Sequence, residues 1–451
     1  MKTDYTYYPN FSEAESGEIY SGRLSTEYIQ CIDEGLDAEG YRDLFLSIEK
    51  MPCSPLKEEF ADTAYKLVSQ LKIRNDYKYK EPSDSEGIFL LSEQLTCTGY
   101  DNYNLHSKVK GAWYGRVIGC LLGKTLEGIR NDELQPFLKE TGNLPMHRYV
   151  LSSDINEDIS ESYKYSFRHK CYADKIDYMP VDDDTNYTVF YQHIIEKYGR
   201  DFTASDVAGE WLKNQTYDTY FTAERVAYFN FINGFKPPFS AVYKNPFREW
   251  IGAQIRGDYF GYINPGNPKA AADMAFRDAS ISHTKNGIYG EMFVSAMIAC
   301  AYSENDPKRI IECGLSYIPT TSRLYEAIKN IISIYSDGKT YEECKKYIHS
   351  VFDDHLSHHW CHTISNAMIV AAALLYGDGD FSSSICKAVE MGFDTDCNGA
   401  TVGSIVGIMN GYDKIDKKWI VNFNDTIETY MQYNKKVKIS DCIDMTIKHI
   451  G

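Results

Sequence analysis

The sequence predicts a mostly α-helical protein. Apolar residues recur at the three-to-four-residue spacing of amphipathic helices through most of the chain, whereas the alternating pattern of strands is nearly absent. Glycines spaced four residues apart mark two further helices. Of the 451 residues, 43% are hydrophobic and 25% are charged, which is ordinary for a globular protein and excludes wholesale disorder.

Residues 1–105 carry the weakest signals, and we expect them to form an accessory helical segment. Helical stretches run from Tyr28 to Gly35 and from Phe60 to Ile73. Pro82, in the run EPSDSEG, marks a break. We expect residues 106–451 to form the catalytic domain.

Helix signals are dense from residue 106 onward. Asp306 before Pro307 is typical of an N-cap with proline at the first helical position. Thr340 with Glu343 predicts a capping box, and residues 366–376 are almost wholly apolar. Two further helices are predicted by helical spacing of apolar residues: Tyr187, Phe190, Tyr191, Ile194 and Tyr198 in one, and Leu324, Ile328, Ile331, Ile332 and Tyr335 in the other.

Two helices carry glycine at every fourth position, so that each row lies on one helix face. Each glycine costs about 1 kcal/mol relative to alanine, and close packing of another backbone along the row would offset this cost. We therefore expect two central helices packed tightly in a soluble core. The alternative is a membrane dimerisation motif, which Arg116 and Lys124 disfavour. The rows are Gly111, Gly115, Gly119 and Gly123, and Gly399, Gly403, Gly407 and Gly411.

Acidic residues lie next to these helices. Glu127 follows the first glycine row, Asp394 and Asp396 precede the second, and the triplet Asp182–Asp184 opens another helix. Antiparallel packing of the two glycine-lined helices would bring the first two clusters to one end, where the triplet could join them. Helix capping alone explains each cluster, but adjacent carboxylates repel one another unless a cation neutralises them. Their oxygens suit Mg²⁺, and Mn²⁺ or Ca²⁺ as alternatives, and two ions about 3.5–4 Å apart would use such a set.

Charge and composition exclude several classes of function. The net charge is -17, so we expect no nucleic-acid partner and no adhesion to anionic membranes. No run reaches about 18 apolar residues, and the N-terminus shows no apolar signal segment. The twelve cysteines include no CxxC pair, which argues against a disulfide framework and favours a cytoplasmic location.

Five segments resemble the ADP-ribosylglycohydrolase family. In chain order they are GAWYGRVIGCLLGKTLEG, VDDDTNYT, NPGNPKAAADMAFRDASISHTKNGIYGEMF, WCHTISNAMIVAAALLYGDGDF and DTDCNGATVGSI, spread over roughly residues 106 to 412. The resemblance implies an all-α orthogonal helix bundle with a binuclear magnesium site. It also implies a hydrolase that cleaves the glycosidic bond at ribose C1 of ADP-ribosyl conjugates, carried by a protein or a small acceptor.

The resemblance also implies which residues act. Glu127, Asp183 and Asp184 are the expected acid/base residues, because water must be delivered to an oxocarbenium-like centre. Asp182 and Cys397 stand where the family usually has threonine; Asp182 adds a charge, and a thiol is a poor partner for Mg²⁺. The expected metal ligands are Glu127, Asp182, Asp183, Asp184, Asp394, Asp396 and Cys397.

Further residues are expected near the substrate: His283, Asn186, Asn398, His362 and Gly399. A hydrogen-bonded core histidine and capping asparagines are the alternatives for His283, Asn186 and Asn398. The run HLSHHWCH contains histidines four residues apart, a spacing that also suits a transition-metal site on a helix, but structural roles are more common. We expect Trp113 and Trp360 in the core.

Two other functions compete with the first. One is hydrolysis of another ribosyl or nucleoside conjugate, which the Asp182 and Cys397 departures favour. The other is ADP-ribose binding without turnover, against which the complete acidic set counts. No oligomeric partner is predicted.

Overall fold

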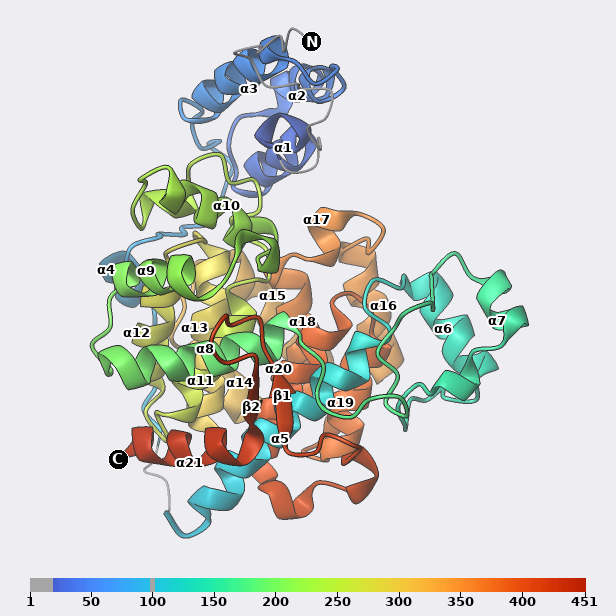
Figure 1. Cartoon of the computed structure of the whole chain (residues 1–451). Coiled ribbons are helices and arrows are strands. Elements are labelled where there is room, and N and C mark those ends of the chain that lie inside the picture. Colours follow the sequence, from blue (N-terminus) through green and yellow to red (C-terminus); the bar gives the residue numbers. More distant parts are fainter. Residues whose placement is uncertain (1–18, 98–101) are drawn as a thin grey trace, which may run out of the picture. The chain divides into compact units, whose positions relative to one another are not determined.

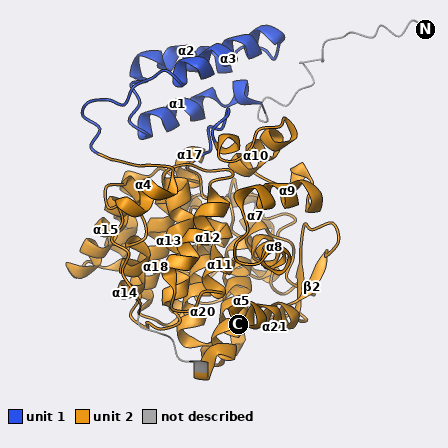
Figure 2. Cartoon of the chain, turned by 90° about the vertical axis from the view of Figure 1, so that its left-hand side faces the viewer, with its two compact units in different colours: residues 1–78, 242–248 blue, residues 79–241, 249–451 orange. Residues whose placement is uncertain are grey.

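The computed structural model describes residues 19–97 and 102–451 (Figure 1). The chain forms two compact units, coloured separately in Figure 2: residues 1–78 with 242–248, and residues 79–241 with 249–451. Residues 1–18 of the expected accessory segment lie outside the described residues. The predicted division at residue 105 into accessory and catalytic parts stays a prediction.

Three α-helices form the described part of the smaller unit: α1 (Leu24–Asp33), α2 (Arg42–Glu49) and α3 (Pro55–Val68). Their small core includes Leu24 and Phe45, both fully buried. Residues 242–248 also belong to this unit, although they are distant from its other residues in sequence. The guanidinium of Arg248 lies 2.9 Å from the Glu27 carboxylate and 2.6 Å from the Glu34 carboxylate.

The larger unit is also helical, which confirms the predicted fold class. Apart from isolated bridges, the β-structure described in it is one antiparallel pair of strands, β1 (Thr426–Glu428) and β2 (Lys436–Lys438). Its α-helices are α4 (Ser85–Leu90), α5 (Leu105–Lys124), α6 (Asn131–Glu140), α7 (Glu157–Ser162), α8 (Asp183–Tyr198), α9 (Ala204–Asn214), α10 (Thr222–Ile232), α11 (Asp258–Tyr262), α12 (Pro268–Ala279), α13 (Asn286–Cys300), α14 (Pro307–Leu315), α15 (Arg323–Ser336), α16 (Tyr341–Val351), α17 (Ser357–Trp360), α18 (Thr363–Gly377), α19 (Phe381–Glu390), α20 (Thr395–Asn410) and α21 (Ile439–Ile450).

The predicted caps form as expected. The Asp306 side chain accepts a hydrogen bond from the backbone N–H of Lys308 at the start of α14. Thr340 and Glu343 make the reciprocal hydrogen bonds of a capping box at α16. The predicted periodic helices correspond to α8 and α15, and the apolar stretch to α18.

The two glycine-lined helices, α5 and α20, lie side by side in the larger unit (Figure 1). Six of their glycines face one another in antiparallel register, and a Cβ added at any of these six would lie closer than 3.0 Å to the carbonyl oxygen of the facing glycine. The predicted close packing of two backbones is therefore confirmed. The facing pairs are Gly111 with Gly407, Gly115 with Gly403, and Gly119 with Gly399.

The fourth glycines of the two rows have different outcomes. Gly123 packs against the backbone of Thr395 at the start of α20, so the predicted close packing of another backbone holds there too. Gly411 differs from the prediction: it follows the last residue of α20 and ends the helix with φ of 74°, a left-handed conformation that glycine adopts without strain.

Across the described residues, no helix combines the length and hydropathy needed to cross a membrane.

Candidate active site and metal centre

The acidic clusters meet where the end of α5 reaches the start of α20. Carboxylate oxygens of Glu127, Asp394 and Asp396 lie within 4.8 Å of one another. Ligand atoms of Asp184, Asp396 and Cys397 also lie within 4.8 Å of one another, so the triplet that opens α8 joins the same site. Antiparallel packing of the glycine-lined helices thus produces the juxtaposition that the sequence predicted.

A cavity of about 260 Å³ opens at this site. Its acidic lining consists of Glu127, Asp182, Asp183, Glu224, Asp394 and Asp396. Its aromatic lining consists of Tyr187, Phe221, Trp360 and Tyr430. A concave surface that combines apolar walls with converging polar groups is the usual setting of a small-molecule site.

Two buried carboxylate oxygens in this cluster have no hydrogen-bond partner among the described residues. They are Oδ2 of Asp184 and Oδ1 of Asp396, and both side chains are almost fully buried. A buried ionised oxygen without a partner is costly, typically by about 1–3 kcal/mol or more. A divalent cation bound between the carboxylates would satisfy both atoms, so the residues present fit a metal centre.

The pKa values of the clustered carboxylates also favour a bound cation. Burial is the main reason why the pKa values of Glu127, Asp183 and Asp396 are raised, and repulsion from neighbouring carboxylates adds to it. Burial and then the Glu127 carboxylate raise the pKa of Asp394 to about 7. These carboxylates therefore resist full ionisation until a cation neutralises them.

Asp182 is engaged differently from the other acids. Its Oδ1 accepts the N–H of Asp184 as the N-cap of α8, at 2.9 Å, and its Oδ2 lies 2.6 Å from the Lys124 ammonium. Burial alone would raise the pKa of Asp182, but the Lys124 charge outweighs it and lowers that pKa. Both oxygens already have partners, so Asp182 is the least available of the predicted ligands. A threonine hydroxyl would make the same cap.

Arg116 fixes the start of α8 beneath the cluster. Its buried guanidinium binds the Asp184 carboxylate at 2.9 Å, the Asp184 main-chain oxygen at 2.9 Å and the Asp258 carboxylate at 2.8 Å. From the sequence, Arg116 and Lys124 were interpreted only as charges that interrupt an apolar helix. A basic residue within a buried, glycine-lined helix could have indicated that an acidic residue of a neighbouring element pairs with it.

Cys397 lines the cavity beside the acids. Burial, followed by the nearby Asp184 carboxylate, raises the pKa of the Cys397 thiol well above its ordinary value. A thiol that keeps its proton is a weak ligand for a hard cation such as Mg²⁺.

The two asparagines and the glycine predicted near the substrate do not line the cavity. Asn186 accepts the backbone N–H of Tyr430 at 2.8 Å, and Asn398 donates to Asn366 at 2.8 Å. The same Asn366 oxygen accepts the N–H of Asp394 at 3.2 Å. These amides hold cavity residues in place, and Gly399 packs against α5.

The two predicted histidines also lie outside the cavity lining. His283 is buried, with its Nδ1 2.8 Å from the Ser282 hydroxyl. His362 is the N-cap of α18, and its Nδ1 accepts the N–H of Ile364 at 3.1 Å. The geometry favours supporting roles for all five residues, and direct substrate contact by them stays a prediction.

The expectation that Trp360 lies in the core is wrong. Trp113 is buried in the core as predicted, but Trp360 is only partly buried and lines the cavity. Its indole N–H donates to the Phe393 carbonyl at 2.8 Å, and the Arg130 guanidinium lies 5.1 Å from its ring centre. The neighbouring His358 accepts the Trp250 indole N–H at 3.1 Å, which is a structural use of that histidine run.

Comparisons with known proteins identify the family of the chain. No curated protein matches the chain. Solved structures that match include an "ADP-ribosylglycohydrolase-related protein complex" with 14% sequence identity and a TM-score of 0.46, covering 77% of this chain and 98% of that one. Residues 101–441 match the family model for ADP-ribosylglycohydrolase, and the helical architecture is that of the all-α fold implied by the resemblance. Since the match spans most of the sequence, the chain belongs to the ADP-ribosylglycohydrolase family.

Proposed function

We propose that this protein is a divalent-metal-dependent hydrolase that cleaves the glycosidic bond at ribose C1 of ADP-ribosyl conjugates. Membership of the family supports a glycohydrolase activity. The observation that carries the metal dependence is the buried carboxylate cluster, in which oxygens of Asp184 and Asp396 find no hydrogen-bond partner in residues 19–97 and 102–451.

Four carboxylates would hold the metal throughout the reaction: Asp183, Asp184, Asp394 and Asp396. Glu127 would join them in the resting site and leave the metal, protonated, when it acts as the acid. Oxygen ligands of this number suit two Mg²⁺ ions, and Mn²⁺ or Ca²⁺ would use the same donors. When bound, the ions would neutralise the cluster and orient the ribose hydroxyls. Asp182 would remain paired with Lys124, and Cys397 would offer only a protonated thiol.

Hydrolysis replaces the bond from C1 to the leaving group with a bond from C1 to the oxygen of water. One proton must leave the water, and one must reach the departing atom. Glu127 is half-buried at the cavity and has a raised pKa, so it is suited to donate the proton to the leaving group. Asp183 is also half-buried in the lining and is suited to accept the proton from water once cations keep it ionised.

The size of the cavity limits what it encloses. At about 260 Å³ it is slightly smaller than the usual range for ligand pockets, roughly 300–1,000 Å³. We therefore expect the cavity to hold the reacting ribose, with the rest of the ADP-ribosyl group extending past Phe221 and Trp360. These two rings offer flat apolar surfaces of the kind on which sugars and bases stack.

The test is release of ADP-ribose from ADP-ribosylated arginine and serine peptides by the full chain, stripped of metal and then supplied with Mg²⁺. We expect Mg²⁺ to restore turnover. Asp396→Asn keeps the side-chain shape but removes the charge, and it should lower turnover by at least about 100-fold. The control is Asp337→Asn at an exposed position after α15, which should retain full turnover.

Three outcomes would contradict the proposal. Full turnover without divalent metal would show that the reaction does not depend on a metal ion. Hydrolysis of other ribosyl or nucleoside conjugates, with none of ADP-ribosyl peptides, would support the second candidate substrate class. ADP-ribose binding without turnover on any substrate would support a binding protein. The cytoplasmic location and the lack of a nucleic-acid partner remain predictions.

A further inference from the structure

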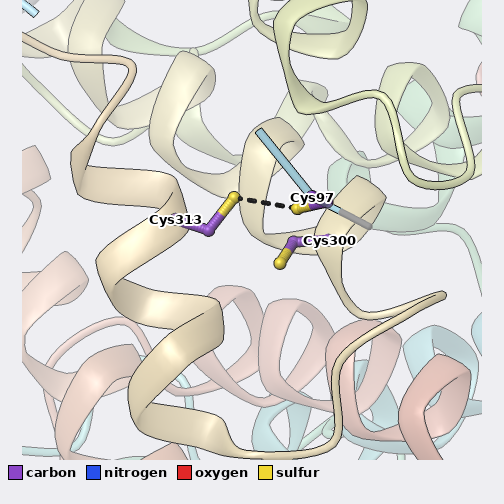
Figure 3. A group of neighbouring side chains, drawn as sticks. All are labelled: Cys97, Cys300 and Cys313. Atoms are coloured by element: carbon purple, nitrogen blue, oxygen red, sulfur yellow. Dashed lines mark hydrogen bonds between the residues drawn. The ribbon is translucent and has the colours of Figure 1, made fainter. Parts of the chain in front are cut away.

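Three cysteines from distant parts of the sequence come together in the larger unit, and none of them lines the acidic cavity (Figure 3). Cys97 lies in the segment after α4, Cys300 is the last residue of α13, and Cys313 belongs to α14. Their sulfur atoms all lie within 4.8 Å of one another, and those of Cys97 and Cys313 are 3.4 Å apart.

The spacing of the sulfurs distinguishes two kinds of chemistry. In a disulfide the two sulfurs are about 2.05 Å apart, and the third cysteine is left out. Thiolates bound to tetrahedral zinc lie about 2.3 Å from the metal, which places the sulfurs roughly 3.8 Å from one another. The Cys97 and Cys313 sulfurs, 3.4 Å apart, are too far from each other for a disulfide, and all three sulfurs lie close enough together to bind one metal ion.

We propose that Cys97, Cys300 and Cys313 form a zinc site that is separate from the acidic cavity. Zinc prefers thiolate ligands, whereas Mg²⁺ prefers the carboxylates of the cavity, so the two sites select different metals. With three protein ligands, the fourth zinc position is filled by water.

The surroundings of the cluster support this assignment. Cys300 and Cys313 are buried and Cys97 is half-buried, so zinc would have a mostly dry site with one open side. The three cysteines line a cavity of about 310 Å³, so a metal ion could reach the cluster from this side.

Zinc binds cysteine as the thiolate, so binding to these three thiols releases protons and strengthens as the pH rises.

A zinc ion at this position would join residues that are 216 positions apart in sequence, Cys97 and Cys313. It would anchor the segment after α4 to α13 and α14. A ligand that binds only the folded chain stabilises it in proportion to the logarithm of its concentration above Kd. We therefore expect zinc to raise the thermal midpoint of the metal-stripped protein.

The test uses the full chain, reduced and stripped of metal, with excess Mg²⁺ present to occupy the oxygen ligands of the acidic cavity. Co²⁺ serves as the probe, because cobalt bound by thiolates has a sulfur-to-metal charge-transfer absorption that oxygen ligands do not produce. We expect one equivalent of Co²⁺ to generate this absorption, and one equivalent of Zn²⁺ to abolish it. Cys97→Ser should remove the absorption and weaken zinc binding by at least about 100-fold.

Cys53→Ser is the matched control, since Cys53 is a half-buried cysteine outside the cluster and its substitution should leave the cobalt spectrum unchanged. Circular dichroism checks that Cys97→Ser is folded. The proposal is wrong if the reduced wild-type chain gives no thiolate absorption, or if the absorption survives in Cys97→Ser. A Cys97–Cys313 disulfide together with no zinc affinity after reduction would show that the cluster is a redox pair instead.

Discussion

The contact between α5 and α20 makes a sharp prediction for Gly115→Ala. The added Cβ would lie closer than 3.0 Å to the carbonyl oxygen of Gly403, a distance that real Cβ atoms essentially never show. Both groups belong to helix backbones, so no side-chain rotation relieves the clash. The two helices would have to move apart, and the end of α5 next to Glu127 would move with them.

Two opposing effects determine how much Gly115→Ala changes the free energy of unfolding. Overpacking a core costs about 1–3 kcal/mol where side chains are able to shift, and a backbone clash belongs at the upper end. Alanine gains about 1 kcal/mol over glycine in helix propensity. We therefore expect Gly115→Ala to lower the free energy of unfolding by about 2 kcal/mol or more.

Urea denaturation followed by tryptophan fluorescence is a suitable assay, because all five tryptophans belong to the larger unit. Gly209→Ala in α9 is the matched control: its added Cβ meets nothing closer than the end of Lys213, at 4.0 Å. That variant should be more stable than wild type by up to about 1 kcal/mol. If Gly115→Ala is as stable as Gly209→Ala, the close packing of the two helices is refuted.

Two further predictions concern the charges at the site. Lys124→Met leaves the buried Asp182 carboxylate without its cation, so the metal-free protein should unfold at lower temperature while its affinity for Mg²⁺, measured by calorimetry, rises; unchanged stability would show that the pair is not energetically important. Asp394 is ionised in the unfolded chain above its ordinary pKa of 3.8 but in the folded, metal-free protein only above about 7. The unfolded state therefore binds fewer protons in this range, and this group makes the metal-free protein less stable as the pH rises through it. Asp394→Asn should flatten that decline in thermal scans at a series of pH values, and an identical decline in both proteins would contradict the assigned pKa.

The helical architecture was predictable because its signals are local or strictly periodic. Caps such as Thr340 with Glu343 depend on residues three positions apart, and the glycine rows require a partner backbone wherever they occur. The antiparallel register then placed Glu127 near Asp394 and Asp396. Gly411 was misassigned because a helix-ending glycine has the same spacing from Gly407 as a packing glycine.

The supporting residues of the site were not predictable in the same way. Whether Asn186 faces a ligand or holds the backbone of Tyr430 depends on the path of residues far along the chain, which no local pattern encodes. The pairing of Lys124 with Asp182 depends on the packing of α5 against α8. Trp360 looked like a core residue because size and hydrophobicity do not distinguish a cavity wall from a core.

The most direct test of the central claim is calorimetry of ADP-ribose binding to the metal-stripped full chain, with and without Mg²⁺. The proposed function predicts binding that requires Mg²⁺ and is lost in Asp396→Asn. Equal affinity in both conditions, or affinity retained by Asp396→Asn, would contradict a metal centre formed by the carboxylates at the ends of α5, α8 and α20.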